Sequence, residues 1–114
     1  MVKKPIDIID LEEGKPTAAE ATEMLKCKIA RCRQRKIKCL YIIHGYGSSG
    51  VGGAICASVR KWLSAQQKNG KIKAVVFGEN FNIVDEVPRY LNNTYEGLEE
   101  LTRVYNHGVT VIEL

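Results

Sequence analysis

Apolar residues recur along the chain with two spacings, and each spacing predicts one kind of secondary structure. Four short runs are apolar throughout or alternate with polar residues, as β-strands do, and they cover residues 6–11, 38–43, 72–77 and 109–114. Two longer stretches repeat apolar residues every three or four positions, as amphipathic helices do. The first stripe is Ala21, Leu25, Ile29 and Cys32, and the second is Ile55, Val59, Trp62 and Leu63.

Capping and turn residues indicate where these elements begin and end. Thr17 is followed three residues later by Glu20, which is the capping-box pattern of a helix start, and Asn69-Gly70 is a stop signal after residues 54–67. The segment 79–106 is an irregular insertion before the last strand. A structureless loop of this length is unusual, so we expect one short helix from near Asp85 and a weak one within 95–105.

The order of the elements predicts the fold class. Two successive strand–helix–strand units favour right-handed crossovers and parallel strands, with helices packed on the sheet. We therefore predict an α/β fold, a compact two-layer β-α-β-α-β-(α)-β sandwich with a mostly parallel four-stranded sheet. With 114 residues, the chain fits a single domain, 1–114, that can bury a hydrophobic core.

The composition is that of a globular protein, with 45% apolar and 26% charged residues. No apolar run approaches the roughly 20 residues of a membrane-spanning helix, and the first residues lack the apolar stretch of a signal peptide. We therefore expect a cytoplasmic protein with no membrane partner. Its cysteines match neither a zinc pair nor a disulfide framework and are expected to be reduced thiols; they are Cys27, Cys32, Cys39 and Cys56.

Positive charge is concentrated in one segment. Seventeen Lys and Arg against thirteen Asp and Glu give a net charge of +4, and residues 26–38 contain seven of the cations. Lys28, Arg31 and Arg35 share one face of the first helix, at intervals of three and four. Such a face could bind the phosphates of a polyanion, or it could be a solvated helix surface.

The glycine-rich turn at residues 44–53, His-Gly-Tyr-Gly-Ser-Ser-Gly-Val-Gly-Gly, is the most informative segment. It lies between a buried strand and a helix, where glycines permit close approach to a ligand and the N–H groups of the helix start favour an anion. The alternative is that the glycines only make a sharp turn. The residues that we expect to meet phosphate are Gly45, Tyr46, Gly47, Ser48, Ser49, Gly50, Gly52 and Gly53, together with Lys28, Arg31 and Arg35.

Two widespread phosphate-binding motifs fit this turn poorly. Gly45-x-Gly47-x-x-Gly50 matches the dinucleotide fingerprint, but the acidic residue expected about 20 positions later is missing, since residues 69–71 are Asn-Gly-Lys. A nucleoside-triphosphate P-loop ends in Gly-Lys-Ser or Gly-Lys-Thr, and residues 51–53 contain no lysine.

A third pattern fits better. The strand ending in Ile-Ile-His-Gly-x-Gly, followed by glycines and a helix, resembles the central motif of Smr (small MutS-related) domains, and residues 106–112 resemble their closing strand. The resemblance covers nearly all of the chain, with residues 41–63 its most specific part. It implies a fold similar to the C-terminal domain of translation initiation factor three. It also implies binding of DNA or RNA and an endonuclease that nicks or cleaves it, as in DNA repair or recombination.

The chemistry that the resemblance implies falls on two candidate catalytic residues, Asp10 and His44. A histidine with an ordinary pKa of about 6.5 can carry a proton, and Asp10 would lie beside His44 if the first two strands pair in parallel. Asp10 could then orient His44 or hold a divalent metal. Glu12 stands where the family's Leu-Asp-Leu-His motif has its histidine, and it could act as a metal ligand or a base. Mg²⁺ or Mn²⁺ is the cofactor this chemistry could use, and no tightly bound group is expected.

Other side chains near the turn allow more than one interpretation. Tyr46 could stack on a base or pack within the loop, and His107 is expected to be a plain surface histidine. Asp7 is expected to face solvent or to cap a neighbouring element. Three functions stay open: a DNA- or RNA-binding domain with weak or conditional nuclease activity, a nucleic-acid-binding module without chemistry, and a binder of a small phosphate or nucleotide.

Overall fold

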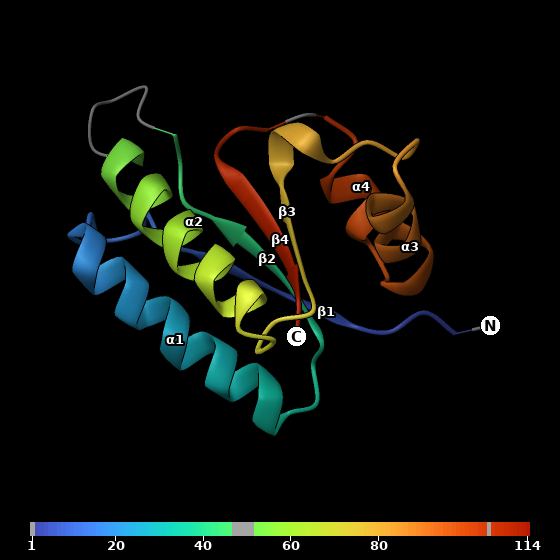
Figure 1. Cartoon of the computed structure of the whole chain (residues 1–114), viewed down its shortest axis with the longest axis horizontal. Helices are drawn as coiled ribbons and strands as arrows, with labels where there is room; N and C mark the ends of the chain where they lie inside the picture. The colour runs from blue at the N-terminus through green and yellow to red at the C-terminus, as the bar shows by residue number, and fades with distance from the viewer. Residues whose placement is uncertain (1, 47–51, 105) are drawn as a thin grey trace.

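The computed structural model describes residues 2–46, 52–104 and 106–114 (Figure 1). The elements follow in the order β1 (Ile6–Asp10), α1 (Ala18–Gln34), β2 (Cys39–Ile43), α2 (Gly52–Lys68), β3 (Ala74–Phe77), the 3-10 turn η1 (Gly78–Asn80), α3 (Glu86–Thr94), α4 (Leu98–Leu101) and β4 (Val109–Glu113). The predicted order of elements is confirmed, including short helices in the irregular segment. In the part of the chain that the structure describes, no helix is long and apolar enough to cross a membrane.

The sheet is mixed, so the prediction of a mostly parallel sheet is wrong. The strands lie in the order β1-β2-β4-β3. β1 pairs in parallel with β2, whereas β4 pairs antiparallel with both β2 and β3. The two crossovers do give β1, β2 and β3 one direction, as expected. After β3, however, the chain passes through α3 and α4 and returns in the opposite direction, and β4 enters between β2 and β3.

Helices cover both faces of this sheet, which corrects the two-layer prediction to three layers. Alternate residues of a strand point to opposite faces, so Leu40 and Ile42 of β2 pack beneath α1 and α2, while Tyr41 joins the core on the α3 and α4 side. Figure 1 shows α1 and α2 side by side on one face and the two short helices on the other. Every residue of β4 is buried, as a central strand between two layers requires.

The first helix forms as its sequence predicts. Its four predicted core residues are all buried. The side chain of Thr17 accepts the N–H of Glu20 at 3.1 Å, and the Glu20 carboxylate accepts the N–H of Thr17 at 2.9 Å. This reciprocal capping box satisfies two N–H groups at the helix start.

Both long helices end in the same hydrogen-bonded motif. Beyond each helix, two successive N–H groups bond back to the carbonyls of its last turn: those of Lys36 and Ile37 after α1, and those of Gly70 and Lys71 after α2. This Schellman motif needs one residue in the left-handed conformation. Gly70 fills that place after α2 with φ 77°, and Lys36 fills it after α1 with φ 60°.

The strand directions give the domain two chemically different ends. β1, β2 and β3 end at one edge of the sheet, which we call the turn end; it comprises residues 10–15, 44–46, 78–80 and 106–108. The last turns of α1 and α2 lie at the opposite edge. We call this the basic end and define it by Arg33, Arg35, Lys36, Lys38, Lys71 and Lys73.

Candidate functional site at the turn end

Backbone hydrogen bonds fix the start of the glycine-rich turn. The N–H groups of His44 and Gly45 both donate to the carbonyl of Gly108, at 2.8 and 3.0 Å. Gly45 has φ 71°, and a Cβ at this position would collide with the Glu12 carboxylate. The positive φ is the condition that favours glycine at this position, because the exposed Glu12 side chain can move aside.

The imidazole of His44 is fully buried, and the protein occupies both of its nitrogens. Nδ1 lies 2.6 Å from the carbonyl oxygen of Gly45, and Nε2 lies 2.8 Å from Oγ1 of Thr110. A carbonyl can only accept, so Nδ1 carries the proton and Nε2 accepts from the Thr110 hydroxyl. That hydroxyl oxygen in turn accepts the Nε–H of Arg60 at 3.1 Å. The chain of donors therefore runs from Arg60 through Thr110 to His44 and fixes one tautomer.

The surroundings keep His44 neutral. Burial lowers its pKa below the ordinary value, and the nearby charge of Arg60 lowers it further. The hydrogen bond to Gly45 and the charge of Glu79 act in the opposite direction without reversing the shift. Protonating Nε2 would also break the bond in which it accepts from Thr110.

An ion pair between Arg60 and Glu79 supports this arrangement, and sequence reasoning missed it. The guanidinium of Arg60 on α2 binds both carboxylate oxygens of Glu79 at 2.7 Å and also donates to the carbonyls of His107 and Val109 at 3.1 and 3.0 Å. Its carbon lies 4.1 Å from the centre of the Phe77 ring. The Arg60 hydrogen bonds lower the pKa of Glu79, although partial burial opposes this. One indication of this ion pair is present in the sequence, where Arg60 directly follows Val59 of the apolar stripe of α2.

Asp10 lies where the sequence predicted, at the end of β1 next to the end of β2. The parallel ladder pairs Asp10 with Ile43, the residue before His44. One Asp10 carboxylate oxygen accepts the N–H of Glu12 at 2.9 Å. Because both nitrogens of His44 have other partners, Gly45 and Thr110 orient its ring, and the predicted orienting role of Asp10 is not what the geometry shows.

A metal at this end would have few protein ligands. Among the residues that the structure describes, no three His, Cys, Asp or Glu side chains come together as a possible metal site. The carboxylates of Asp10 and Glu12 are the candidate donors that the sequence named. Two carboxylates suit Mg²⁺ when phosphate oxygens and waters supply its other ligands.

Comparison with known proteins shows to which family the chain belongs. A sequence model of the Smr domain family matches residues 9–79, a span that contains Asp10, His44 and both partners of the Arg60–Glu79 pair. The chain belongs to the Smr domain family. Among solved structures, the crystal structure of the Smr domain of Thermus thermophilus MutS2 is similar, with a TM-score of 0.55 and 20% identity over 99% of this chain and 98% of that chain. At this identity the likeness shows the fold. No curated protein matched the chain.

The rest of the glycine-rich turn of this Smr domain is described only in part. Gly52 and Gly53 are the first residues of α2, whose start therefore lies at the turn end. Gly47, Ser48, Ser49 and Gly50, which the sequence assigned to phosphate binding, lie outside the described residues.

Two rings are exposed at the turn end of the Smr domain. Tyr46 is 58% exposed, and the side chain of His107 is 66% exposed, as expected for a surface histidine. Their centroids lie 6.0 Å apart, with the ring planes inclined at 53°. This spacing is typical of a tilted aromatic contact, and it leaves ring surface open to solvent.

The basic helix face predicted to assist the turn lies elsewhere. Lys28 and Arg31 lie in the second half of α1, which runs away from the turn end, and Arg35 is the residue that caps its C-terminus. Lys28 pairs with Asp7 at 2.8 Å, and Arg35 lies 3.7 Å from the same carboxylate. The structure therefore joins Asp7, which was expected to face solvent or to cap a neighbour, to these cations. It does not bring the cations to the glycine-rich turn.

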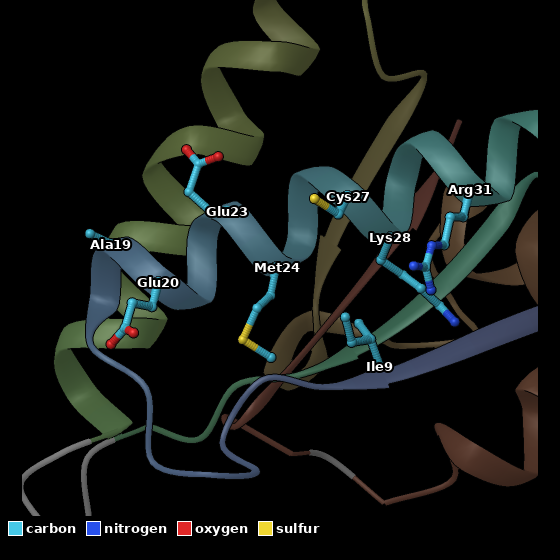
Figure 2. Close-up of a pocket in the computed structure, with 8 residues that line it drawn as sticks. All are labelled: Ile9, Ala19, Glu20, Glu23, Met24, Cys27, Lys28 and Arg31. Carbon is cyan, nitrogen blue, oxygen red and sulfur yellow. The ribbon is translucent and has the colours of Figure 1, made fainter.

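A groove of about 640 Å³ separates α1 from the edge strand β1. Figure 2 shows Met24 of α1 and Ile9 of β1 lining the groove, with Glu20 toward the start of α1 and Lys28 and Arg31 toward its end. The charge along α1 thus changes from acidic to basic between the two ends of the domain.

Proposed function

We propose that this Smr domain binds DNA or RNA without cleaving it, and that His44 is a positioning residue for the glycine-rich turn. The observation that carries the proposal is the hydrogen bonding of the His44 ring, whose two nitrogens are both engaged inside the protein. A general acid or base must reach the reacting oxygen of the substrate and have a pKa near the working pH. His44 is buried and its pKa is lowered, which suits a fixed neutral support.

Three features support nucleic acid as the partner. Smr domains are associated with nucleic-acid binding, and this chain belongs to that family. Its net charge of +4 favours polyanions. The exposed rings of Tyr46 and His107 offer surfaces on which a base could stack, and base–aromatic stacking tolerates any sequence.

The second candidate is a nicking endonuclease that uses a divalent metal. It is favoured by Asp10, whose exposed carboxylate lies at the turn end, and by the Glu12 carboxylate beside Gly45. Bound there with the phosphate, Mg²⁺ or Mn²⁺ would polarise the phosphate and lower the pKa of a bound water. Asp10 and Glu12 would hold the ion, and His44 would still only position the turn.

A cleavage assay separates the two candidates. Purified protein is incubated with labelled single-stranded, duplex and branched DNA and RNA, in Mg²⁺, Mn²⁺ or EDTA, and binding is measured in parallel. We expect binding without cleavage from the wild type. Metal-dependent cleavage that disappears in Asp10→Asn and Glu12→Gln while binding persists would replace our proposal with the nuclease.

Variants of His44 test its positioning role. His44→Gln should lower the thermal midpoint and weaken binding, and Thr110→Val, which removes the hydroxyl partner but leaves the imidazole, should do the same to a smaller degree. If wild-type protein cleaves, and if His44→Gln is as stable as wild type yet inactive, a proton-transfer role for His44 would be correct instead. Saturable binding of a mononucleotide with no affinity for polymers would indicate the third function, a small phosphate binder.

A further inference from the structure

The folded chain gathers cations from distant segments at its basic end. The guanidinium of Arg33 at the end of α1 donates to the carbonyl of Lys71 at 2.7 Å, which ties the turn before β2 to the turn before β3. The N–H of Lys73 donates to Glu113, and the carbonyl of Lys38 accepts the N–H of Leu114, so Lys73 and Lys38 flank the end of β4. All six residues that define the basic end are exposed. The sequence run 33–38 thus supplies only part of this surface.

Little negative charge opposes these cations. Among the described residues, Asp7 is the one carboxylate in an ion pair with the basic end, through Arg35 at 3.7 Å. Glu113 is 6% exposed, and its carboxylate accepts the hydroxyls of Tyr90 and Tyr95 at 2.8 and 2.6 Å. By contrast, the turn end exposes the carboxylates of Asp10, Glu12 and Glu13. A polyanion is therefore attracted to the end of the domain opposite the glycine-rich turn.

The backbone of Lys36 gives a second, independent indication. Its φ of 60° lies in the left-handed region, where a side chain costs about 1 kcal/mol or more and glycine costs almost nothing. The equivalent position after α2 is Gly70, at φ 77°. Both helices thus end in a Schellman motif. After α1, the left-handed position of this motif is occupied by an exposed lysine, Lys36, in place of a glycine. At the basic end the strained position therefore adds one more exposed cation, where the equivalent position after α2 is a glycine.

The surroundings favour nucleic acid over an anionic membrane. Surfaces that bind membranes combine basic residues with exposed apolar side chains that enter the lipid. Among the described residues, the large apolar side chains that are exposed include none from 31–38 or 68–73. The basic end is therefore a purely polar, cationic surface, as a contact with a sugar–phosphate backbone requires.

We propose that the basic end is the main contact with the sugar–phosphate backbone of DNA or RNA, and that it lies at the opposite edge of the sheet from the glycine-rich turn. The proposal rests on the proposed function and deepens it. Phosphate contacts supply most of the sequence-independent affinity of such complexes, so the basic end provides affinity, while the rings at the turn end contact bases.

Matched triple variants test the proposal. One lacks three cations of the basic end, Lys38→Gln, Lys71→Gln and Lys73→Gln; the other lacks three exposed cations from outside both ends, Lys4→Gln, Lys61→Gln and Arg103→Gln. Both lose the same net charge. Binding of short labelled DNA and RNA duplexes and single strands is measured over a range of salt concentrations. We expect the first variant to bind at least about tenfold more weakly than wild type and its salt slope to fall by about three, with little change in the second.

A pair of glycine substitutions separates strain from function. Lys36→Gly should raise the thermal midpoint of unfolding by a few degrees, because it relieves the left-handed conformation, and should still weaken binding by about threefold. Lys15 has φ 50° at the turn end, so Lys15→Gly relieves the same kind of strain and should raise the thermal midpoint by a similar amount; it is the control for the stability change.

The outcomes distinguish this proposal from the proposed function. Equal affinities of the two triple variants, or a Lys36→Gly variant that binds as well as wild type, would overturn this proposal while nucleic-acid binding stands. No binding of any nucleic acid by the wild type would overturn both. Binding to phosphatidylserine vesicles in its place would assign the basic end to membranes.

Discussion

The two ends of this Smr domain both contain charged residues, but they use them differently. At the turn end, Arg60 donates to a carboxylate, a hydroxyl and two carbonyls, and His44 is buried and neutral. At the basic end, Arg33 makes one bond to a backbone carbonyl, and the lysines around it face solvent. Charge satisfied inside the protein stabilises the fold, whereas charge left in water is available to a partner.

The largest expected effect comes from removing the arginine of the turn end. Arg60→Met leaves the Glu79 carboxylate without its partner and removes the donor to Thr110, so we expect a loss of about 3 kcal/mol in the free energy of unfolding. Urea denaturation measures it. The matched control is Arg35→Met at the basic end, where the side chain is 67% exposed, with an expected change within about 0.5 kcal/mol. Similar losses in both variants would remove the contrast between the ends.

Two glycines, one at each end, should differ for a physical reason. A Cβ on Gly78 would meet the backbone carbonyl oxygens of Asn106 and Val109, and backbone cannot easily move. We expect Gly78→Ala to cost about 2 kcal/mol. Gly70 has φ 77° with open space around it, so Gly70→Ala should cost about 1 kcal/mol from backbone conformation alone. Thermal or urea unfolding of both variants measures the two losses of stability. A larger loss of stability in Gly70→Ala than in Gly78→Ala would contradict the prediction.

Acid should weaken the turn end through His44. Its pKa is lowered in the folded state, so the unfolded chain binds the proton more readily, and stability rises with pH through this window. The contribution is fully present above an ordinary histidine pKa of about 6.5 and is lost below it, at no more than about 1.4 kcal/mol per pH unit. Glu79, whose pKa is lowered, adds a separate loss at pH values below the ordinary range of a carboxylate.

The test is to measure the unfolding free energies of wild type and His44→Gln between about pH 7.5 and about pH 5, an interval that spans the ordinary histidine pKa. The unfolding free energy of His44→Gln should change less with pH than that of the wild type. His107→Gln, which removes the other histidine of the chain from an exposed position 3.7 Å from the Glu79 carboxylate, is the comparison, and the slope should flatten more in His44→Gln than in His107→Gln. If the unfolding free energy of His44→Gln changes with pH as steeply as that of the wild type, His44 is not the cause of the acid sensitivity.

The smallest expected effect concerns Asp7. Partial burial opposes ionisation, but the hydrogen bond from Lys28 and the charges of Lys28 and Arg35 lower the pKa of this carboxylate overall. Asp7→Asn should therefore free two cations near the basic end and raise nucleic-acid affinity about two- to threefold, as expected for a partly exposed pair. Glu13→Gln, which removes one exposed carboxylate from the turn end, should change affinity less. Titrating a labelled nucleic acid with each variant at low salt measures both affinities and shows whether they differ.

Periodicity predicted the parts of this fold that depend on neighbours along the chain. The apolar stripe of α1 and its capping box involve residues a few positions apart, and both form as predicted. The run in β2 predicted a strand buried on both faces, and it is. The place of β4 was not predictable in this way, because its apolar residues suit any central strand and contain no information about which strands flank it.

The candidate site shows the same limit. His44 stood out through its motif, but its partner Thr110 and the Arg60–Glu79 pair come together only when α2, η1 and β4 meet. The position of the basic residues, however, could have been inferred. In a strand–helix–strand unit the helix runs back along the sheet, so cations in the second half of α1 must lie away from the turn that follows β2.

The central place of β4 has a consequence for how the domain acquires its structure during synthesis. β4 follows all the other strands along the chain, yet it is the strand that joins β2 to β3. Until residues 109–113 have left the ribosome, β3 has no partner in the sheet and one edge of β2 stays open. Folding before that point can build only the β1–α1–β2 unit and the α2 that packs against it. This domain should therefore complete its sheet in one late step, after a period in which exposed strand edges make it vulnerable to aggregation.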